Sequence, residues 1–257
     1  MTTASVDRNA LESRVKSMYS DVAANPHGEF HFEMGRAMAE RLGYEAGDLD
    51  RIPADAIDSF AGVGHFFHLA GLRAGERVVD LGSGSGMDSF IAALEVGPSG
   101  AVVGVDMTDA QLAKATRLAE AHGLRTVSFR KGYIEETGLP EGSFDCVISN
   151  GVINLAADKA RVFREAARLL KSGGRLAIAD IVTEQPLPEN VACNADLWAA
   201  CIGGAAQQAD YRSVIEAAGL AIERVEDNGQ YRFLSDSARK ATAKWGVKSV
   251  SILARKP

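Results

Sequence analysis

From residue 76 onward, short apolar runs alternate with stretches in which apolar residues recur every three or four positions. The runs are typical of buried strands, and the wider spacing is typical of amphipathic helices. The runs predict strands at Arg77–Leu81, Val102–Asp106, Val127–Arg130, Phe144–Ser149 and Arg175–Ile181. The stretches between them predict helices near Asp88–Val96, Asp109–Ala121 and Lys159–Leu170. This alternation predicts an α/β fold with a doubly wound parallel sheet, whose strand C-termini share one ligand-binding edge.

Residues 1–70 precede this alternation and have a different pattern. Apolar positions and turn signals in them predict three helices, at Asp7–Ala24, Arg36–Leu42 and Ala54–Phe60. We expect these helices to form an N-terminal helical lid over a core made of residues 71–257. Within the core, a pocket-forming helical insertion is predicted at about residues 186–218, with helices at Asn190–Ala206 and Asp210–Ala218. Two closing strands, Ala221–Glu226 and Lys248–Ala254, would complete a mostly parallel seven-stranded sheet with an antiparallel last strand.

Composition and charge narrow the class of protein. With 257 residues, 46% of them hydrophobic, the chain suits one α/β domain with an extension. The net charge of -6 is spread without a basic patch, so we expect neither nucleic acid nor membrane as a partner. No apolar run approaches the roughly 20 residues of a membrane span, and the polar start lacks a signal-peptide core. We therefore expect a cytoplasmic monomer or homodimer that acts on a small molecule.

The stretch Asp80-Leu-Gly-Ser-Gly-Ser-Gly-Met-Asp88 reads as a strand, a tight turn and the start of a helix. Glycines at alternate positions leave backbone N–H groups bare at a helix N-terminus, where a nucleotide-like cofactor can bind. A dinucleotide-binding fingerprint needs a further glycine where this chain has Met87, which argues against a nicotinamide cofactor. Asp106, at the end of the second strand, is the second acid of the predicted site.

Other polar residues are predicted at the same edge of the sheet. Asp109 is a candidate N-cap, and Met107 either packs in the core or lies against an adenine ring. The turn Gly132-Tyr-Ile-Glu135 follows the third strand and can bring its backbone close to a ligand. Asn150 follows a buried strand, so its amide needs a partner, either within a turn or on a ligand.

The two acids around the glycine turn resemble those of class I S-adenosylmethionine-dependent methyltransferases, which have a Rossmann-like core. Further motifs, Gly104-Val-Asp-Met-Thr108, Ser149-Asn-Gly-Val-Ile-Asn-Leu155 and Leu197-Trp-Ala-Ala-Cys-Ile-Gly-Gly-Ala205, resemble the arsenite methyltransferases, from about Tyr19 to Ala205. The resemblance implies S-adenosyl-L-methionine as cofactor and S-adenosyl-L-homocysteine as product. The expected cofactor-binding residues are Asp80, Gly82, Ser83, Gly84, Gly86, Asp88, Asp106, Met107, Gln111, Gly132, Tyr133, Ile134, Glu135 and Asn150.

The acceptor is a separate question, because trivalent arsenic is soft and is bound by thiolates. Cys201 matches one cysteine of the family, whereas Gly151 stands where the family has another, and a third is absent from Asn25-Pro-His-Gly28. On a continuous helix Cys193 would lie about 12 Å along the axis from Cys201, too far to share one arsenic atom. Cys146, within a strand, reads as a small buried hydrophobe.

These observations lead to a hypothesis for the site. Catalytic candidates are Cys201, Tyr19 and Asn150, and the substrate pocket is expected to contain Gly151, Asn154, Trp198 and Cys201. Gly151 is expected to open the pocket floor to a bulkier acceptor. No resident metal is expected, because the pairs His27 with His31 and His65 with His68 lack an acidic or thiol partner at ligand spacing. Methylation of an O, N, C or S atom of an organic metabolite, and binding of cofactor or metalloid without turnover, are the alternatives.

Overall fold

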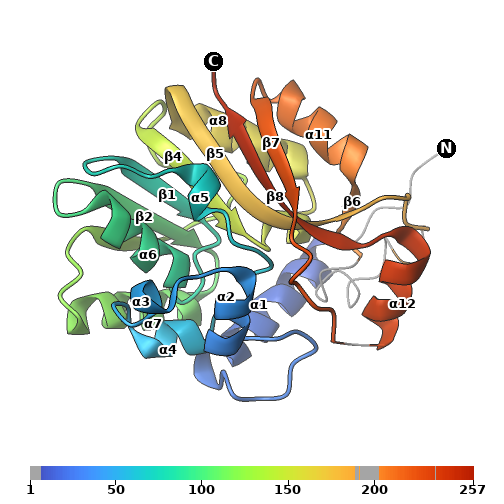
Figure 1. The fold of residues 1–257 in the computed structure, drawn as a ribbon, viewed down its shortest axis with the longest axis horizontal. Coiled ribbons are helices and arrows are strands. Elements are labelled where there is room, and N and C mark those ends of the chain that lie inside the picture. The colour runs from blue at the N-terminus through green and yellow to red at the C-terminus, as the bar shows by residue number, and fades with distance from the viewer. Residues whose placement is uncertain (1–6, 189–190, 192–202, 235) are drawn as a thin grey trace.

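The protein is described by a computed structural model that covers residues 7–188, 191, 203–234 and 236–257 (Figure 1). Its sheet has the strand order β3-β2-β1-β4-β5-β8-β7, with β6 paired to the end of β5. The strands are β1 (Arg77–Leu81), β2 (Ala101–Asp106), β3 (Val127–Lys131), β4 (Phe144–Asn150), β5 (Leu170–Thr183), β6 (Ala206–Gln207), β7 (Ala221–Asp227) and β8 (Lys248–Arg255). The predicted fold class is confirmed: β1 to β5 pair in parallel, and β8 is antiparallel to both β5 and β7. The described sheet has eight strands and not the predicted seven, because the short β6 adds to the end of β5.

Two buried apolar clusters lie on opposite faces of this sheet. Successive residues of β1 point to opposite faces, so Val78 belongs to one cluster and Val79 to the other. The first cluster is covered by α6 (Met87–Val96) and α7 (Asp109–Ala121), the second by α8 (Lys159–Leu169) and α11 (Gln208–Ala217). The strand order reverses between β1 and β4, and ligands of open α/β sheets bind where the order reverses.

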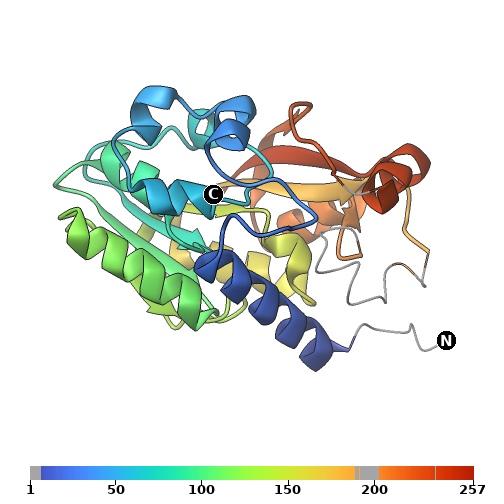
Figure 2. The ribbon, with the colours of Figure 1, turned by 90° about the horizontal axis from the view of Figure 1, so that it is seen from below.

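The N-terminal helices extend the first of these layers. They are α1 (Arg8–Ala24), α2 (Arg36–Leu42), α3 (Ala46–Leu49), α4 (Ala54–Asp58) and α5 (Phe67–Ala70). Helix α1 begins after Asp7, whose Oδ1 accepts hydrogen bonds from the backbone N–H groups of Asn9 and Ala10, and it packs on α7 (Figure 2). The helices predicted here are therefore present; the division into lid and core at residue 70 stays a prediction.

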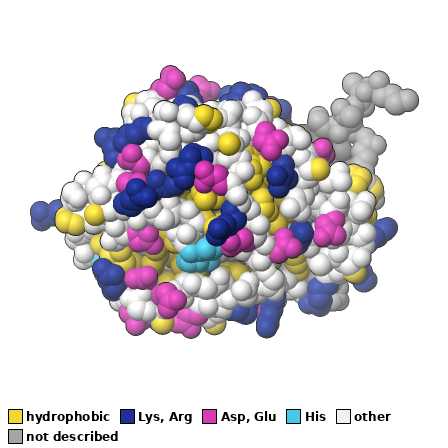
Figure 3. Space-filling view, turned by 45° about the horizontal axis from the view of Figure 1, so that its top comes forward, with side chains coloured by type: hydrophobic (Ala, Val, Ile, Leu, Met, Phe, Trp, Pro, Cys, Tyr) yellow, Lys and Arg dark blue, Asp and Glu magenta, His cyan; other side chains and the backbone are white. Residues whose placement is uncertain are grey.

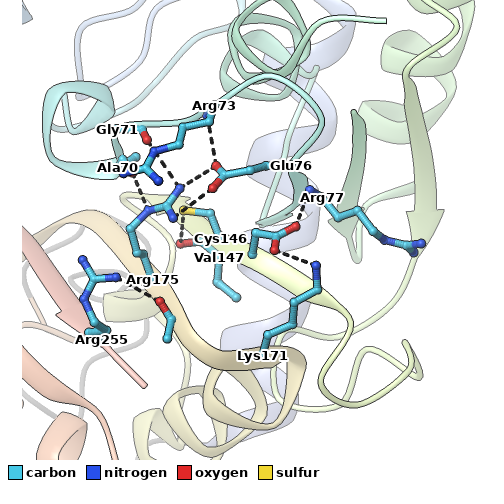
Figure 4. Close-up of polar contacts among 12 residues, drawn as sticks. Ala70, Gly71, Arg73, Glu76, Arg77, Cys146, Val147, Lys171, Arg175 and Arg255 are labelled. Carbon is cyan, nitrogen blue, oxygen red and sulfur yellow. Dashed lines mark hydrogen bonds and ion pairs between the residues drawn. The ribbon is translucent and has the colours of Figure 1, made fainter. Parts of the chain in front are cut away.

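A polar cluster closes the edge of the sheet opposite the strand C-termini (Figure 4). The guanidinium of Arg175, on β5, binds both carboxylate oxygens of Glu76 at 3.0 and 2.6 Å and donates to the carbonyl of Ala70 at 2.6 Å. Bidentate charge-assisted bonds of this kind are strong and geometrically specific. They fix the end of α5, and thus the exit of the N-terminal segment, against the central strands.

Several expectations about element ends are wrong. Helix α7 begins at Asp109, with Thr108 as its N-cap, so Asp109 is the first helical residue and not the cap. The two closing strands do pair, β7 antiparallel to β8, but α12 (Asp236–Trp245) lies between them in the chain, where no helix is predicted. The helix predicted at Asn190–Ala206 falls mostly outside the described residues, and its last residue, Ala206, belongs to β6.

Candidate active site

A cavity of about 390 Å³ lies at the C-terminal ends of β1, β2 and β4, beneath the N-terminal segment. The core contributes residues 80, 82–85, 87 and 88, the end of β2 with the start of α7, the turn 132–136 and the segment after β4; the predicted cofactor-binding residue Gly86 is not part of this lining. The N-terminal segment contributes one side of α1 and residues near the end of α4. The cavity therefore lies between the predicted lid and the predicted core.

Two glycines of the turn, Gly82 and Gly84, line the cavity. Gly82 has φ 79°, in the left-handed region that favours glycine, and its N–H donates to the Val105 carbonyl at 2.7 Å. A Cβ built at Gly82 would lie 2.5 Å from two side-chain carbons of Val152, which also lines the cavity. Among the described residues, the buried hydroxyl of Ser83 has no hydrogen-bond partner, so a polar group is left for a ligand.

Three aspartates surround this turn. Asp106 accepts hydrogen bonds from the backbone N–H groups of Gly84 at 3.0 Å and Thr108 at 2.8 Å, so it ties the glycine turn to the end of β2. Asp80 is buried and accepts from the Ser89 hydroxyl at 2.6 Å. Burial, followed by the nearby Asp88, raises the pKa of Asp80 to about 8.

Burial also raises the pKa of Asp88 to about 6, and burial raises the pKa of Asp106 from its usual value. A cluster of desolvated carboxyl groups favours a ligand that brings positive charge, because a nearby cation stabilises the ionised form.

The turn after β3 and the start of α7 line one side of the cavity. Met107, Gln111, Gly132, Tyr133, Ile134 and Glu135 all contribute to the lining, as expected for cofactor-binding candidates. Met107 also packs against the first apolar cluster, so both of its expected roles are compatible with its position. Burial raises the pKa of Glu135 above its usual value.

Two of these residues also hold α1 in place. The Gln111 amide donates to the Tyr19 carbonyl at 2.9 Å and accepts from the Ser85 hydroxyl. The Tyr133 hydroxyl donates to Glu12 at 2.7 Å and accepts from Lys16 at 3.1 Å. The side of the cavity formed by α7 and the turn after β3 is therefore linked to α1 by hydrogen bonds.

Asn150 lines the cavity, but its amide is used by the protein. Its Nδ2 donates to the Gly64 carbonyl and to an Asp88 carboxylate oxygen, both at 3.0 Å. Its Oδ1 accepts from the N–H of Val63 at 2.8 Å. These partners come from distant segments of the chain and not from a turn around Asn150, so the side chain organises the site from within.

The expected substrate-pocket residues divide into two groups. Gly151 is buried at φ 70°, and a Cβ built there would lie 3.1 Å from the Val63 side chain. The expectation that Gly151 opens the pocket floor is therefore wrong, because Val63 fills the space in front of it. Asn154 is also outside the described lining: its side chain is buried, and its backbone N–H donates to Asp180 at 2.9 Å.

The other two expected pocket residues are Trp198 and Cys201, and Tyr19 is a further catalytic candidate. Cys193, Trp198 and Cys201 lie outside the described residues. Tyr19 lines the cavity and stacks on Phe32, with ring centroids 6.2 Å apart.

Cys146 is fully buried in β4, where burial raises its thiol pKa to about 12. Its prediction as a buried hydrophobe is confirmed.

The sequence analysis missed Tyr44, which hydrogen-bonds to Asp88, and the cavity residues Phe60, Ala61, Gly62, Leu155, Asp158 and Arg161. Phe60, Ala61 and Gly62 come from the N-terminal segment, and no sequence motif marks them. Leu155, Asp158 and Arg161 lie in the segment that follows β4. Their position after a strand that ends at the ligand-binding edge is a signal that could have identified them.

Comparison with known proteins agrees with this geometry. A family model described as a methyltransferase domain matches residues 72–219. The crystal structure of an arsenic(III) S-adenosylmethionine methyltransferase from Chlamydomonas reinhardtii is 32% identical, with a TM-score of 0.64, over 87% of this chain and 74% of that one. The chain belongs to the S-adenosylmethionine-dependent methyltransferases. The predicted resemblance to the arsenite methyltransferases is thus confirmed.

Curated members of the family are longer than this chain. The arsenite methyltransferase of Halobacterium salinarum is 40% identical over 85% of this chain and 56% of its own length. That of Aquipseudomonas alcaligenes is 43% identical over 65% of this chain and 50% of its own length. The chain therefore spans about half the length of the curated methyltransferases that it matches here.

Proposed function

We propose that this chain binds S-adenosylmethionine in the cavity and transfers its methyl group to a small acceptor. The observation that carries the proposal is the placement of Asp80 and Asp106 on either side of a glycine turn that a Cβ would obstruct. This cofactor carries positive charge, so its site needs acidic groups nearby, polar groups for the methionine portion and hydrogen-bond acceptors for the ribose. The buried acids and the Ser83 hydroxyl fit these needs.

When bound, S-adenosylmethionine supplies an electrophilic methyl group on a sulfonium. The chain's own residues bind the cofactor and orient it. Asp80 and Asp88 are placed to stabilise positive charge, and a cation beside them lowers their raised pKa values. Leu11 and Val15 of α1 cover the cavity with apolar surface, which excludes water from a transfer whose rate comes mainly from positioning and desolvation.

Titration calorimetry tests this proposal. We expect the wild-type protein to bind S-adenosylmethionine and S-adenosylhomocysteine, and Asp106→Asn to weaken both by about tenfold or more, since a bond to a charged group contributes about 1.5–3 kcal/mol. Asp109→Asn is the matched control, because Asp109 lies just beyond on the same strand-to-helix connection and is exposed in an ion pair with Lys131. Absence of binding to the wild-type protein would refute the proposal.

For the acceptor, the first candidate is trivalent arsenic, with Cys201 as a thiolate ligand; the names of the relatives and the matching motif support it. The second candidate is an organic metabolite methylated at O, N, C or S. It is favoured by the polar and apolar groups of the described cavity lining, which include carboxyl, hydroxyl and amide groups, and by the absence from this sequence of two of the family's cysteines. Binding without turnover is the third.

Turnover assays separate these candidates. Arsenite and a panel of organic acceptors would be compared with the wild-type protein and with Cys201→Ser. Loss of arsenite methylation in the variant, with cofactor affinity unchanged, supports the thiolate mechanism. Activity on an organic acceptor that survives the substitution supports the second candidate, and no turnover with any acceptor supports the third.

On the face shown in Figure 3, basic and acidic side chains are interspersed. Among the described helices, none has the length and apolar character needed to cross a membrane. The cytoplasmic location and the monomer or homodimer stay predictions.

A further inference from the structure

Tyr44 reaches from the N-terminal segment into the core beside the proposed cofactor site. It lies between α2 and α3, is 4% exposed, and donates its hydroxyl hydrogen bond to Asp88 Oδ1 at 2.6 Å. The rings of Phe60 and His65 pack edge-on against it, with centroids 5.2 and 4.7 Å away. The aromatic ring is therefore held in one place, and its hydroxyl meets a carboxylate that lines the cavity.

Asn150 completes this contact from the other side. Its Nδ2 lies 3.1 Å from the Tyr44 hydroxyl and 3.0 Å from Asp88 Oδ2, so each carboxylate oxygen of Asp88 has its own donor. The Asn150 carbonyl oxygen accepts from the backbone of Val63 and Gly64, at 2.8 and 3.3 Å. One network thus joins the N-terminal segment, β4 and the first turn of α6.

The charged and titratable groups around Asp88 come from three directions. One is Asp80, on β1, whose pKa is raised first by burial, then by the charge of Asp88 and also by that of Asp106. Tyr44 faces Asp88 from the N-terminal segment, backed by His65, whose pKa burial and His68 lower to about 4. Burial disfavours the ionised form of Asp88, while the bonds from Tyr44 and Asn150 favour it.

We propose that Tyr44 is a positioning residue for cofactor binding, whose hydroxyl fixes the orientation and the ionised state of the Asp88 carboxylate in the cavity lining. The inference rests on the proposed function, because it assumes that the cavity binds S-adenosylmethionine. It also makes the N-terminal segment part of the cofactor site, since Tyr44 reaches Asp88 from outside the core.

Tyr44→Phe tests the inference, with Tyr211→Phe as a matched control. Tyr211 is also buried and donates a hydrogen bond at 2.6 Å to a buried aspartate, Asp180. Neither Tyr211 nor Asp180 belongs to the described cavity lining. The dissociation constant of S-adenosylhomocysteine would be measured by calorimetry from pH 5 to 9. Both substitutions remove a hydroxyl from a buried site, so both are expected to lower the melting temperature.

The pH profile separates the two variants. Loss of a bond that favours the ionised form raises the pKa of Asp88, so in Tyr44→Phe the loss of affinity at low pH is expected about one pH unit higher. Tyr211→Phe is expected to keep the wild-type profile. The inference is overturned if Tyr44→Phe also keeps the wild-type profile, or if both variants shift alike.

Asp88→Asn carries the test if Tyr44→Phe does not fold, because an amide keeps an acceptor for the Tyr44 hydroxyl and cannot ionise. The part of the profile that belongs to Asp88, near pH 6, is expected to disappear. Retention of that part would overturn the inference. Absence of any binding by the wild-type protein would instead count against the proposed function.

Discussion

The contact between Gly82 and Val152 allows a quantitative test of how the glycine turn is built. In Gly82→Ala the new methyl group would lie 2.5 Å from both γ-carbons of Val152 and 2.8 Å from its Cβ. The left-handed backbone at φ 79° adds about 1–2 kcal/mol, and overpacking adds about 1–3 kcal/mol. The free energy of unfolding should therefore fall by about 2–5 kcal/mol, measured by urea denaturation.

Two comparisons separate these contributions. Gly123 has φ 63° with no described atom within 4 Å of a built Cβ, so Gly123→Ala should cost only the backbone part, about 1–2 kcal/mol. Val152→Ala removes the two γ-carbons, so the double variant Gly82→Ala with Val152→Ala should be more stable than the sum of its single changes by about 1 kcal/mol or more. The pair Gly123→Ala with Val152→Ala should be additive. Additivity in the Gly82 pair as well would refute the steric explanation.

Three further predictions concern the ionisation of Asp80, the ion pair between Arg175 and Glu76, and the reactivity of Cys146. Asp80→Asn should stabilise the cofactor-free protein more at pH 8 than at pH 5, measured by urea denaturation. The pKa of Asp80 is raised to about 8 in the folded protein, so this carboxyl lowers the free energy of unfolding as pH rises from its unfolded pKa near 4. A larger stabilisation at pH 5 than at pH 8 would contradict this reasoning. Arg175→Lys should lower the free energy of unfolding by about 1.5–3 kcal/mol while calorimetry finds cofactor affinity unchanged, because its bidentate ion pair lies at the opposite edge of the sheet. In the double variant Cys193→Ser with Cys201→Ser, the remaining Cys146 should react with Ellman's reagent only after unfolding, and rapid labelling of the native protein would disprove its burial.

The elements of the core could be predicted because their signals are local. A strand such as Arg77–Leu81 is an apolar run that breaks into glycine, and its predicted ends match the structure. The acids of the site could be found for the same reason, since Asp80 and Asp106 end adjacent parallel strands and so meet at one edge. Helix α12 lies between the two closing strands, where the sequence pattern predicts no helix.

The remaining parts of the site depend on contacts between distant segments. The side chain nearest to Gly151 is Val63, which is 88 positions earlier in the chain, and Asp88 is bound by a tyrosine 44 positions before it. No periodicity or motif encodes such pairings, because they arise only when the N-terminal segment packs on the sheet. For this reason the missing cysteine at position 151 suggested an open pocket floor, whereas the fold fills that space with a valine.

If the proposed function holds, the arrangement of the cavity separates the two tasks of a methyl transfer. The carboxyl groups suited to the cofactor come from the core, on β1, β2 and α6, whereas Leu11, Val15 and Tyr19 of α1 add apolar and aromatic surface. Because Gln111 and Tyr133 hydrogen-bond to α1 from the core, that surface is held at a fixed distance from the cofactor groups. Side chains of α1 that face the cavity can therefore change which acceptor is bound without disturbing the acids. A change at Tyr44, by contrast, acts on the cofactor site itself, although it too lies in the N-terminal segment.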